Sequence, residues 1–539
     1  MIYMRCISFI AVLLCALLSV SAHSFAAHDA ELSNQSDGDT RAKKLACELI
    51  KAIEDNDIKK VKQFLASPGI DVNRLGVVDG DSITPLIAAL VSGKTEYVRL
   101  LLNAPGIDVN RPGVVDGDSI TPLIAALVSG KTEYVRLLLN APGIDVNRPG
   151  VKDGDSITPL IAALVSGRTE YVRLLLNAPR IDVNRPVVVD GITMTPLIAA
   201  LGSGSTEYVR LLLNAPEIDV NRPGVKDGDS ITPLIAALGS GRTEYVRLLL
   251  NAPGIDVNRL GVRDGITITP LWMAVVSGST EYVRLLLNAP GIDVNRPSVK
   301  DGDSITPLME ASASGKTEIV RLLLNAPDIN VNFTGSKGYT ALHLAAVAGR
   351  KDCIRLLLAA SGINVNPVDQ DGNTPLFYAV DNDHRDCVYL LLSDSRINAN
   401  ITFRKGYSLL HIIAGDSNIP DQIPYLRHLL NAPGILVNKT DDKGATPLLV
   451  CVMNVDDPEC LRLLLSAPGI DVNHPDCKGW TALHVAALFG KTKFVELLLA
   501  TPGINPYAVD SSGNTALYIA QKKGYTRIAE LLRAAMKKK

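Results

Sequence analysis

A stretch of 37 residues occurs twice in succession without a single change. The segment "VVDGDSITPLIAALVSGKTEYVRLLLNAPGIDVNRPG" fills residues 77–113 and fills residues 114–150 again. An identical tandem copy restricts the fold more than composition does, because each copy must form the same local structure and present the same surfaces to its two neighbours. The sequence therefore predicts a stack of equivalent units rather than several separate globular domains.

The tripeptide Thr-Pro-Leu marks the period of the array. Seven copies begin 37 residues apart, and six variants of it follow at intervals of 34 to 38 residues. An opening copy at 45–73 lacks the tripeptide but ends in the same phrase, "PGIDVN", which brings the count to fourteen units. The repeated threonine or serine stands at Thr84, Thr121, Thr158, Thr195, Thr232, Thr269, Thr306, Thr340, Thr374, Ser408, Thr446, Thr481 and Thr515.

Each copy carries the signals of two short helices. The hydroxyl of Thr84 is placed to cap a helix, and Pro85 stands at its first position, where a missing N–H has no cost. Gly93 is placed to end that helix in a left-handed conformation, and Thr95 is placed to cap a second helix that reads "EYVRLLLN". The leucines at 100–102 point about 100° apart around this helix, so they must be buried on several sides. The sequence therefore predicts a helical hairpin that is stable only when it is stacked on its neighbours.

Three later segments resemble the ankyrin repeat closely. They are "DQDGNTPL" at 369–376, "GYTALHLAAVAGRKDCIRLLLAASGINVN" at 338–366 and "GWTALHVAALFGKTKFVELLLATPGIN" at 479–505. The resemblance covers 45–536 and implies two antiparallel helices per unit, a β-hairpin finger between units and a curved stack. The expected fold class is an all-α repeat solenoid of about 14 ankyrin units with β-hairpin fingers. The units of 37 residues carry about three extra residues before the threonine, so their fingers are expected to be longer than is usual in the family.

The array and its flanks give a plan of the chain. We expect an N-terminal capping unit at 45–76, long-finger repeats at 77–332, more standard repeats at 333–513, and a C-terminal capping unit with a basic tail at 514–539. A polar stretch without helical or strand period, 23–44, is expected to be a flexible leader.

The first 22 residues have the pattern of a secretory signal peptide. Arg5 precedes an apolar run at 7–20, and small residues end at Ala22 and again at Ala26, where cleavage is possible. A run of this length falls short of the roughly 20 residues that a spanning helix needs, and no later segment is long and apolar enough. Cys15 follows Leu14 rather than a small residue, which argues against a lipid anchor. We therefore expect an exported chain, periplasmic or extracellular, without a membrane span after cleavage.

Composition and motifs argue against several functions. The formal net charge is −2 and aromatic residues make up 5% of the chain, which argues against binding of nucleic acid. Phosphate loops, nucleophile elbows and zinc-binding motifs are missing from the sequence, so we expect no enzyme activity and no cofactor. The repeated "DGDS" clusters lack the spacing of a calcium loop and favour tight turns instead. The resemblance implies that His343, His411 and His484 hydrogen-bond between repeats rather than act in catalysis.

Cysteine placement allows one disulfide to be considered. Cys353 and Cys387 lie in stacked helices roughly 8–10 Å apart, which is too far for a bridge. Cys451 and Cys460 lie in facing helices of one unit and are the best candidate pair. Cys477 stands on a finger and is expected to be exposed.

Positions that differ between near-identical copies indicate where structure does not dictate the residue. Such positions fall six and three residues before the threonine and ten residues after it, in the fingers and in the turn between helices, where ankyrin proteins commonly bind other proteins. The isoleucine just before the threonine is either a contact stripe or packing of finger against finger, and packing is favoured because an exposed row promotes aggregation. The candidate partner-binding residues are Asp81, Ile83, Lys94, Asp118, Ile120, Lys131, Lys152, Asp155, Arg168, Lys226, Arg263, Lys300 and Trp480.

These observations favour a non-catalytic scaffold that binds another protein in an exported compartment. We expect the chain itself to be a monomer. Two alternatives stay open, namely a structural spacer or envelope element without a dedicated partner, and an enzyme-associated or toxin-like exported factor.

Overall fold

The structure is a computed structural model that describes residues 37–78, 80–152, 155–402, 404–415 and 422–537. The chain divides into two compact bodies, Met1–Met273 with Asn288–Ile292 and Ala274–Leu287 with Asp293–Lys539. The predicted signal peptide and residues 23–36 of the predicted leader lie outside the described residues. In the described part of the chain, none of the helices is both long and apolar enough to cross a membrane.

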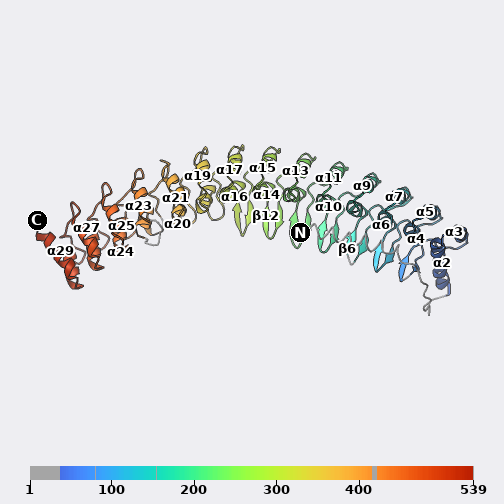
Figure 1. Cartoon of the computed structure of the whole chain (residues 1–539), viewed down its shortest axis with the longest axis horizontal. Coiled ribbons are helices and arrows are strands. Elements are labelled where there is room, and N and C mark those ends of the chain that lie inside the picture. The colour runs from blue at the N-terminus through green and yellow to red at the C-terminus, as the bar shows by residue number, and fades with distance from the viewer. Residues whose placement is uncertain (1–36, 79, 153–154, 403, 416–421, 538–539) are drawn as a thin grey trace. The chain divides into compact units, whose positions relative to one another are not determined.

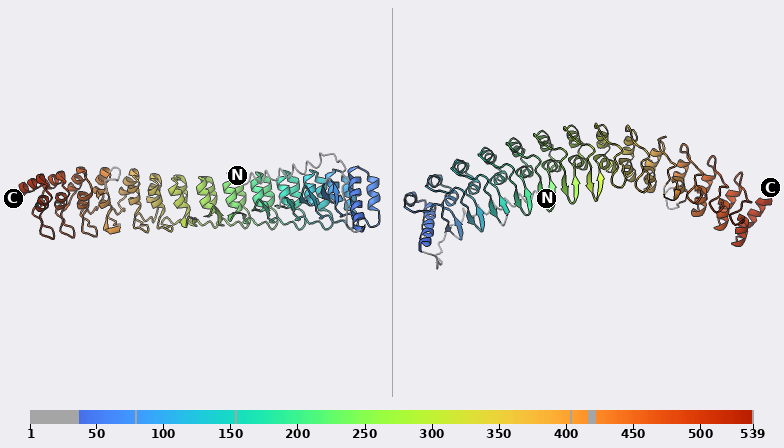
Figure 2. Two further views of the ribbon diagram at one scale, coloured as in Figure 1. Left: turned by 90° about the horizontal axis from the view of Figure 1, so that it is seen from below. Right: turned by 180° about the vertical axis from the view of Figure 1, so that it is seen from behind.

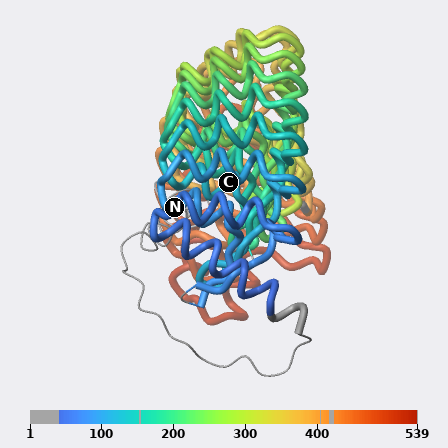
Figure 3. Tube along the Cα trace, turned by 90° about the vertical axis from the view of Figure 1, so that its right-hand side faces the viewer, coloured from blue at the N-terminus to red at the C-terminus, as the bar shows by residue number. Residues whose placement is uncertain are grey.

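Fourteen pairs of helices follow one another along the described chain, which confirms the predicted number of repeats. In the first body, the first helices of successive repeats lie side by side, and the second helices form a parallel row next to them (Figures 1 and 2). Figure 3 shows the same path of turns in copy after copy. The first helices are α2 (Asp37–Glu54), α4 (Pro85–Val91), α6 (Pro122–Val128), α8 (Pro159–Val165), α10 (Pro196–Ser203), α12 (Pro233–Gly239) and α14 (Pro270–Ser277), of which α14 belongs to the first body only as far as Met273. The second helices are α3 (Ile58–Leu65), α5 (Thr95–Leu102), α7 (Thr132–Leu139), α9 (Thr169–Leu176), α11 (Thr206–Leu213) and α13 (Thr243–Leu250).

The second body repeats this arrangement with first and second helices packed on their own kind. Its first helices are α16 (Pro307–Ala313), α18 (Ala341–Val347), α20 (Pro375–Asp381), α22 (Leu409–Gly415), α24 (Pro447–Asn454), α26 (Ala482–Leu488) and α28 (Ala516–Lys522). Its second helices are α15 (Thr280–Leu287), α17 (Thr317–Leu324), α19 (Lys351–Leu358), α21 (Arg385–Leu392), α23 (Gln422–Leu430), α25 (Pro458–Leu465), α27 (Thr492–Leu499) and α29 (Thr526–Lys537). A short 3-10 turn, η1, covers Arg404–Gly406.

The predicted helix signals are confirmed in the first helix of each copy but not in the second. The Thr84 hydroxyl accepts a hydrogen bond from the backbone N–H of Ile87 at 3.2 Å, and Gly93 has φ of 75°, in the left-handed region. The second helix begins at Thr95 itself, so the prediction that Thr95 is its cap was wrong. Lys94 occupies the N-cap position and makes no capping hydrogen bond with its side chain.

The side chain of the basic residue at this N-cap position instead donates a hydrogen bond to the end of the first helix of the preceding repeat. Arg242 donates from Nη1 to the carbonyl of Gly204 at 2.7 Å, and its Cζ lies 5.4 Å from the ring centroid of Tyr245. Gly204 ends α10, where carbonyl groups have no partner inside the helix and the helix dipole is negative. Where Ser205 replaces the cation, its hydroxyl accepts from the N–H of Tyr208 at 3.4 Å and caps its own helix.

An asparagine at the end of each copy bridges to the next copy. The side-chain amide of Asn147 donates to the carbonyl of Arg180 at 2.8 Å, and its oxygen accepts from the N–H of Asp182 at 2.8 Å. The same pair of bonds joins Asn366 of the second body to the next repeat. Because both halves of the amide are used, this asparagine is a stacking element. The residues in this role are Asn73, Asn110, Asn147, Asn184 and Asn221 in the first body and Asn295, Asn332, Asn366, Asn400, Asn438 and Asn473 in the second.

Buried histidines make a second bridge in the second body. Nδ1 of His343 accepts from the backbone N–H of Thr340 at 3.2 Å, so Nε2 carries the hydrogen and donates to the carbonyl of Asn373 in the next repeat at 3.2 Å. His411 and His484 make the equivalent bonds. Burial lowers the pKa of all three imidazoles. The inter-repeat role that the resemblance implied is confirmed.

The long fingers are two-stranded hairpins that also pair with each other. Asp116 and Gly117 have φ of 49° and 86°, which makes a two-residue turn of the kind that favours Asp-Gly. Strands β1 to β6 form one antiparallel sheet in chain order, a feature that the sequence did not predict. The strands are β1 (Gly76–Val78), β2 (Asp81–Ile83), β3 (Gly113–Val115), β4 (Asp118–Ile120), β5 (Gly150–Lys152), β6 (Asp155–Ile157), β7 (Val187–Val189), β8 (Ile192–Met194), β9 (Gly224–Lys226), β10 (Asp229–Ile231), β11 (Gly261–Arg263) and β12 (Ile266–Ile268) in the first body and β13 (Ser298–Lys300) and β14 (Asp303–Ile305) in the second.

The predicted leader needs one correction. Helix α2 begins at Asp37, so residues 37–44 are helical rather than the end of a flexible stretch. The helix continues into the opening unit, where Leu49, Ile50 and Ile53 are fully buried. The apolar spacing of the opening unit therefore extends the helix past the boundary that polarity alone suggested.

We predict that loss of one asparagine bridge loosens the stack locally. Asn147→Ala removes two hydrogen bonds and is expected to reduce the free energy of unfolding by about 1–2 kcal/mol. The amide of Asp182 should then exchange its hydrogen faster in a hydrogen-exchange experiment. Asn140→Ala, at an exposed helix end, is the matched control and should change stability by less than about 0.5 kcal/mol. Equal effects of the two variants would contradict the bridging role.

We predict that acid destabilises the second body through its buried histidines. Because their folded pKa values lie below the ordinary 6.5, the unfolded chain binds more protons, so stability falls as the pH drops below about 6.5 toward the folded pKa. The limiting slope is about 1.4 kcal/mol per pH unit for each histidine. Thermal unfolding between pH 7.5 and 5 measures it.

The chain supplies a control for this pH dependence, because its long-finger copies carry isoleucine at the histidine position, as at Ile87. A variant with isoleucine at 343, 411 and 484 should lose much of the slope. An unchanged slope would mean that other groups cause the acid sensitivity.

Candidate functional site

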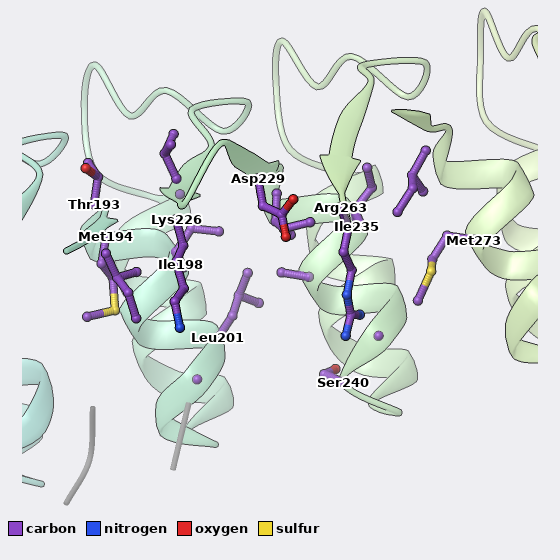
Figure 4. A pocket seen from close by; sticks show the side chains of 18 of the residues that line it. Thr193, Met194, Ile198, Leu201, Lys226, Asp229, Ile235, Ser240, Arg263 and Met273 are labelled. Atoms are coloured by element: carbon purple, nitrogen blue, oxygen red, sulfur yellow. The ribbon is translucent and has the colours of Figure 1, made fainter. Parts of the chain in front are cut away.

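A groove of about 650 Å³ opens in the first body between the fingers and the first helices (Figure 4). Strands β8 to β12 supply one wall, and α10, α12 and the start of α14 supply the floor. The lining is mostly apolar, with Ile192, Ile198 and Leu201 at one end and Ile235 and Met273 at the other. A concave site of this size with an apolar lining and a few polar groups is typical of ligand and peptide sites.

Two glycines open the groove. Gly202 and Gly239 line it near the end of α10 and at the end of α12. The position seven residues after the threonine holds valine in the preceding copies, at Val91, Val128 and Val165. The missing side chains leave space over the floor, and a Cβ added at Gly239 meets one atom within 4 Å, the methyl carbon of Met273 at 3.6 Å. The groove therefore results from a local change in sequence, glycine in place of valine, in an otherwise uniform repeat.

Two basic side chains reach over the apolar floor from the fingers. Figure 4 shows Lys226 extending from β9 past Ile198 toward Leu201, and Arg263 extending from β11 beside Ile235. Lys226 has no hydrogen-bond or ion-pair partner among the described residues. The guanidinium of Arg263 lies 3.6 Å from the carboxylate of its neighbour Asp264, with both side chains largely exposed.

The remaining charged groups in the lining have structural partners. Arg242 is held by the carbonyl of Gly204. Asp229 accepts a hydrogen bond at 2.7 Å from the backbone N–H of Asp264, at the turn of the next finger. Three cations and one carboxylate thus line the groove, and Lys226 and Arg263 are the two cations without a backbone partner.

The structure brings two of the predicted partner-binding residues together, Lys226 and Arg263. Asp81 and Asp155 are half-buried and accept backbone N–H groups from the next finger, those of Asp116 at 2.8 Å and Asp190 at 3.1 Å. The remaining acidic candidate, Asp118, is half-buried at the start of β4. The aspartates that vary between copies therefore help to hold neighbouring fingers together. The comparison of copies had indicated, wrongly, that structure does not dictate the residue at this position.

The basic residues that follow the first helices are corrected to a structural role. Lys94 donates to the carbonyl of Glu54 at 3.3 Å, Lys131 donates to the carbonyl of Gly93, and Arg168 donates to the carbonyl of Gly130 at 3.0 Å. They vary between copies because lysine and arginine both reach these carbonyls, and serine caps the second helix instead.

The isoleucine row is packing, as the favoured interpretation predicted. Ile120 is 7% exposed and Ile83 is half-buried, so Ile120 is not open to a partner and its place among the contact residues was wrong. The exposed apolar row of the fingers is the central valine of every first strand except β11, including Val77 at 61% exposure. Side-chain alternation along the strand places the two rows on opposite faces.

Three further candidates are not part of the groove lining. Lys152 ends β5, and Lys300 ends β13 in the second body and is exposed. Trp480 is half-buried at a finger of the second body, where its backbone N–H donates to the Asp476 carboxylate at 2.8 Å.

The six cysteines of the described residues are free thiols. The Sγ atoms of Cys451 and Cys460, both fully buried, lie 3.1 Å apart in facing helices, as the spacing predicted for the best candidate pair. Cys477 is exposed. Within the described residues, no three histidine, cysteine, aspartate or glutamate side chains lie close enough together to hold one metal ion.

Sequence reasoning missed Gly202 and Gly239. The signal was present, since the comparison of copies shows valine replaced by glycine in two successive repeats. The replacement gave no prediction of a groove because glycine near a helix end ordinarily marks the end of the helix rather than a space left by a missing side chain.

Comparisons with known proteins agree with the geometry. The family model for ankyrin repeats in three copies matches residues 49–150, 147–224, 185–260, 221–298, 258–335, 308–403 and 448–539. No curated protein sequence matches the chain.

Similar solved structures include the ankyrin repeat domain of Bcl-3, a member of the IkappaB family, at 25% identity over 42% of this chain and 98% of that domain, with a TM-score of 0.38. An ankyrin repeat domain from Acinetobacter baumannii AYE is 28% identical over 36% of this chain and 97% of its own, with a TM-score of 0.33. The family model, which matches far more than half of the sequence, shows that the chain belongs to the ankyrin repeat family.

Proposed function

We propose that this protein is a non-catalytic scaffold that binds another protein through the groove between β8–β12 and the first helices of the first body. The observation that carries the proposal is an open apolar floor beside Lys226, a cation without a partner in the described chain. Ankyrin repeats are generally protein-interaction scaffolds. An apolar floor beside an unpaired lysine is suited to a partner whose apolar side chains cover the floor and whose carboxylates neutralise the lysine charge.

We further propose that binding takes place in an exported compartment, periplasmic or extracellular. The support is the pattern of residues 1–22, a basic residue before a short apolar run and small residues before the expected cleavage points. The chain is proposed to act as a monomer, with its repeats stacked only on one another. N-terminal sequencing of the native protein, expected to begin after Ala22 or Ala26, tests the export.

A structural spacer is the competing function, and the identical copies at 77–113 and 114–150 favour it. Uniform copies lengthen a stack without adding a site. The groove distinguishes the two functions, because a spacer has no use for two glycines that reduce the packing of its own repeats. An enzyme-associated or toxin-like factor has no such supporting observation.

We predict that filling the groove abolishes partner binding. Gly202→Val together with Gly239→Val restores the side chain that three preceding copies carry, so folding should be retained. Exclusion of a single leucine-sized side chain costs about 1.5–3 kcal/mol, so retention of the bound protein should fall about tenfold or more. The measurement is quantitative mass spectrometry of proteins captured from the native compartment on the wild-type and the filled chain, with matching thermal melts.

The control exchanges a valine for glycine away from the groove, Val91→Gly, and should leave capture unchanged. Equal capture by the wild-type and filled chains would place the site elsewhere in the array. Failure of the wild-type chain to capture any protein above bare resin would leave the spacer as the better account.

A further inference from the structure

The chemistry of the groove indicates which partner segment it takes, an inference that rests on the proposed function. We propose that the groove binds a short peptide segment that combines acidic side chains with leucine, isoleucine, valine or phenylalanine. The apolar side chains of the segment occupy the space that Gly202 and Gly239 leave open, and its carboxylates pair with Lys226 and Arg263.

The acidic preference follows from the charges in the lining. Lys226, Arg242 and Arg263 face a single carboxylate, Asp229. Asp229 already accepts a backbone N–H, and Arg242 is held by a backbone carbonyl. Lys226 is therefore the cation left to pair with a ligand, and Arg263, whose ion pair with Asp264 is exposed at 3.6 Å, can exchange that partner for a ligand carboxylate. An ammonium over an apolar floor is less well hydrated than one in open water, which strengthens its attraction to a carboxylate.

Three kinds of departure from the repeat meet in this one groove. Glycine replaces valine at 202 and 239. Lysine or arginine stands at 226 and 263, where two earlier copies hold Val115 and Val189, although Lys152 and Lys300 show that a basic residue at this position is not confined to the groove. Both valines are buried, at 6% and 1% exposure, so the uncharged residue is the one that packs. Isoleucine at 192, which lines the groove, replaces the aspartate that holds neighbouring fingers elsewhere. Among the 37-residue copies, glycine seven residues after the threonine occurs only at 202 and 239, so the glycines are the change that sets this groove apart, and the cations give it charge.

The floor distinguishes a peptide from a phosphate-rich ligand. Ile198, Leu201, Ile235 and Met273 give a phosphate no hydrogen bond. The lining contains no aromatic ring on which a nucleic-acid base stacks, and Asp229 repels a polyanion. A segment with alternating acidic and apolar side chains satisfies both the cations and the floor.

Trp272 provides a reporter for occupancy. It is 9% exposed and packs in a cluster with Ile231 and Met273, which line the groove. The chain has two tryptophans, so Trp480→Phe leaves Trp272 as the single source of tryptophan emission. Binding in the groove should change that emission, whereas binding elsewhere on the array should not.

The test is selection of random twelve-residue peptides, displayed on phage, against the full-length protein. We expect enriched peptides to hold at least two Asp or Glu together with at least two large apolar residues. Synthetic copies should alter Trp272 fluorescence in the Trp480→Phe chain. Raising the salt from 50 to 500 mM should weaken their binding, because both cations are near solvent.

Two matched variants separate the parts of the proposal, and each uses residues that other copies carry. Lys226→Val with Arg263→Val should weaken the enriched acidic peptides at least tenfold and leave neutral apolar peptides unchanged. Gly202→Val with Gly239→Val should abolish binding of both classes. Thermal melts and circular dichroism spectra that match the wild type verify that the variants fold.

Each other outcome overturns a stated part. Enriched peptides without acidic residues would reject the proposed chemistry and leave the groove as a binding site. Acidic peptides that bind both variants like the wild type would reject the groove. Enrichment of phosphate-binding or nucleic-acid ligands in a parallel selection, with none for peptides, would reject the partner class. No enrichment of any ligand would count against the proposed function itself.

Discussion

Burial of apolar side chains between neighbouring repeats is the interaction on which the rest of the structure depends. Helices of seven or eight residues are unstable in isolation, because nucleation costs more than so few hydrogen bonds return. Here Val98 and Leu101 of a second helix and Ala89 and Leu90 of a first helix are completely buried. Each repeat can exist only between neighbours of the same shape, which explains why the copies hold their core residues constant.

Polar bridges then fix the register of the stack. The asparagine bridges, the histidine bridges of the second body and the basic N-cap residues all satisfy backbone groups of a neighbouring repeat that would otherwise lack a partner. Their positions differ in how far they tolerate substitution. The asparagine must both donate and accept, whereas any cation of sufficient length serves at the N-cap, and serine is an adequate substitute because it caps its own helix.

The proposed binding groove is a local departure from this uniform array. Gly202 and Gly239 remove side chains from the floor of the groove. Lys226 and Arg263 add positive charge, and Ile192 adds apolar surface, all within the same few repeats. A groove made in this way costs little packing, because glycine replaces a valine at the edge of the floor rather than one in the core. Repeats before it continue the stack unchanged, so a site can be altered without redesigning the scaffold.

The sequence by itself determined the number of repeats, their helix pairs and the capping threonines, because these depend on periodicity and on local hydrogen bonding. The role of the inter-repeat histidines came from the resemblance to ankyrin repeats. Only the tertiary structure decided which variable residues are free. Lys94, Lys131 and Arg168 vary between copies, yet they donate to carbonyls about 40 residues away in sequence. Ile120 was a candidate contact residue, yet its side chain is buried. The pairing of neighbouring fingers, as in the sheet of β1 to β6, and the groove also arise from contacts between copies. Variation within a repeat shows that several residues fit a position, and the neighbouring repeat determines whether that position faces a partner.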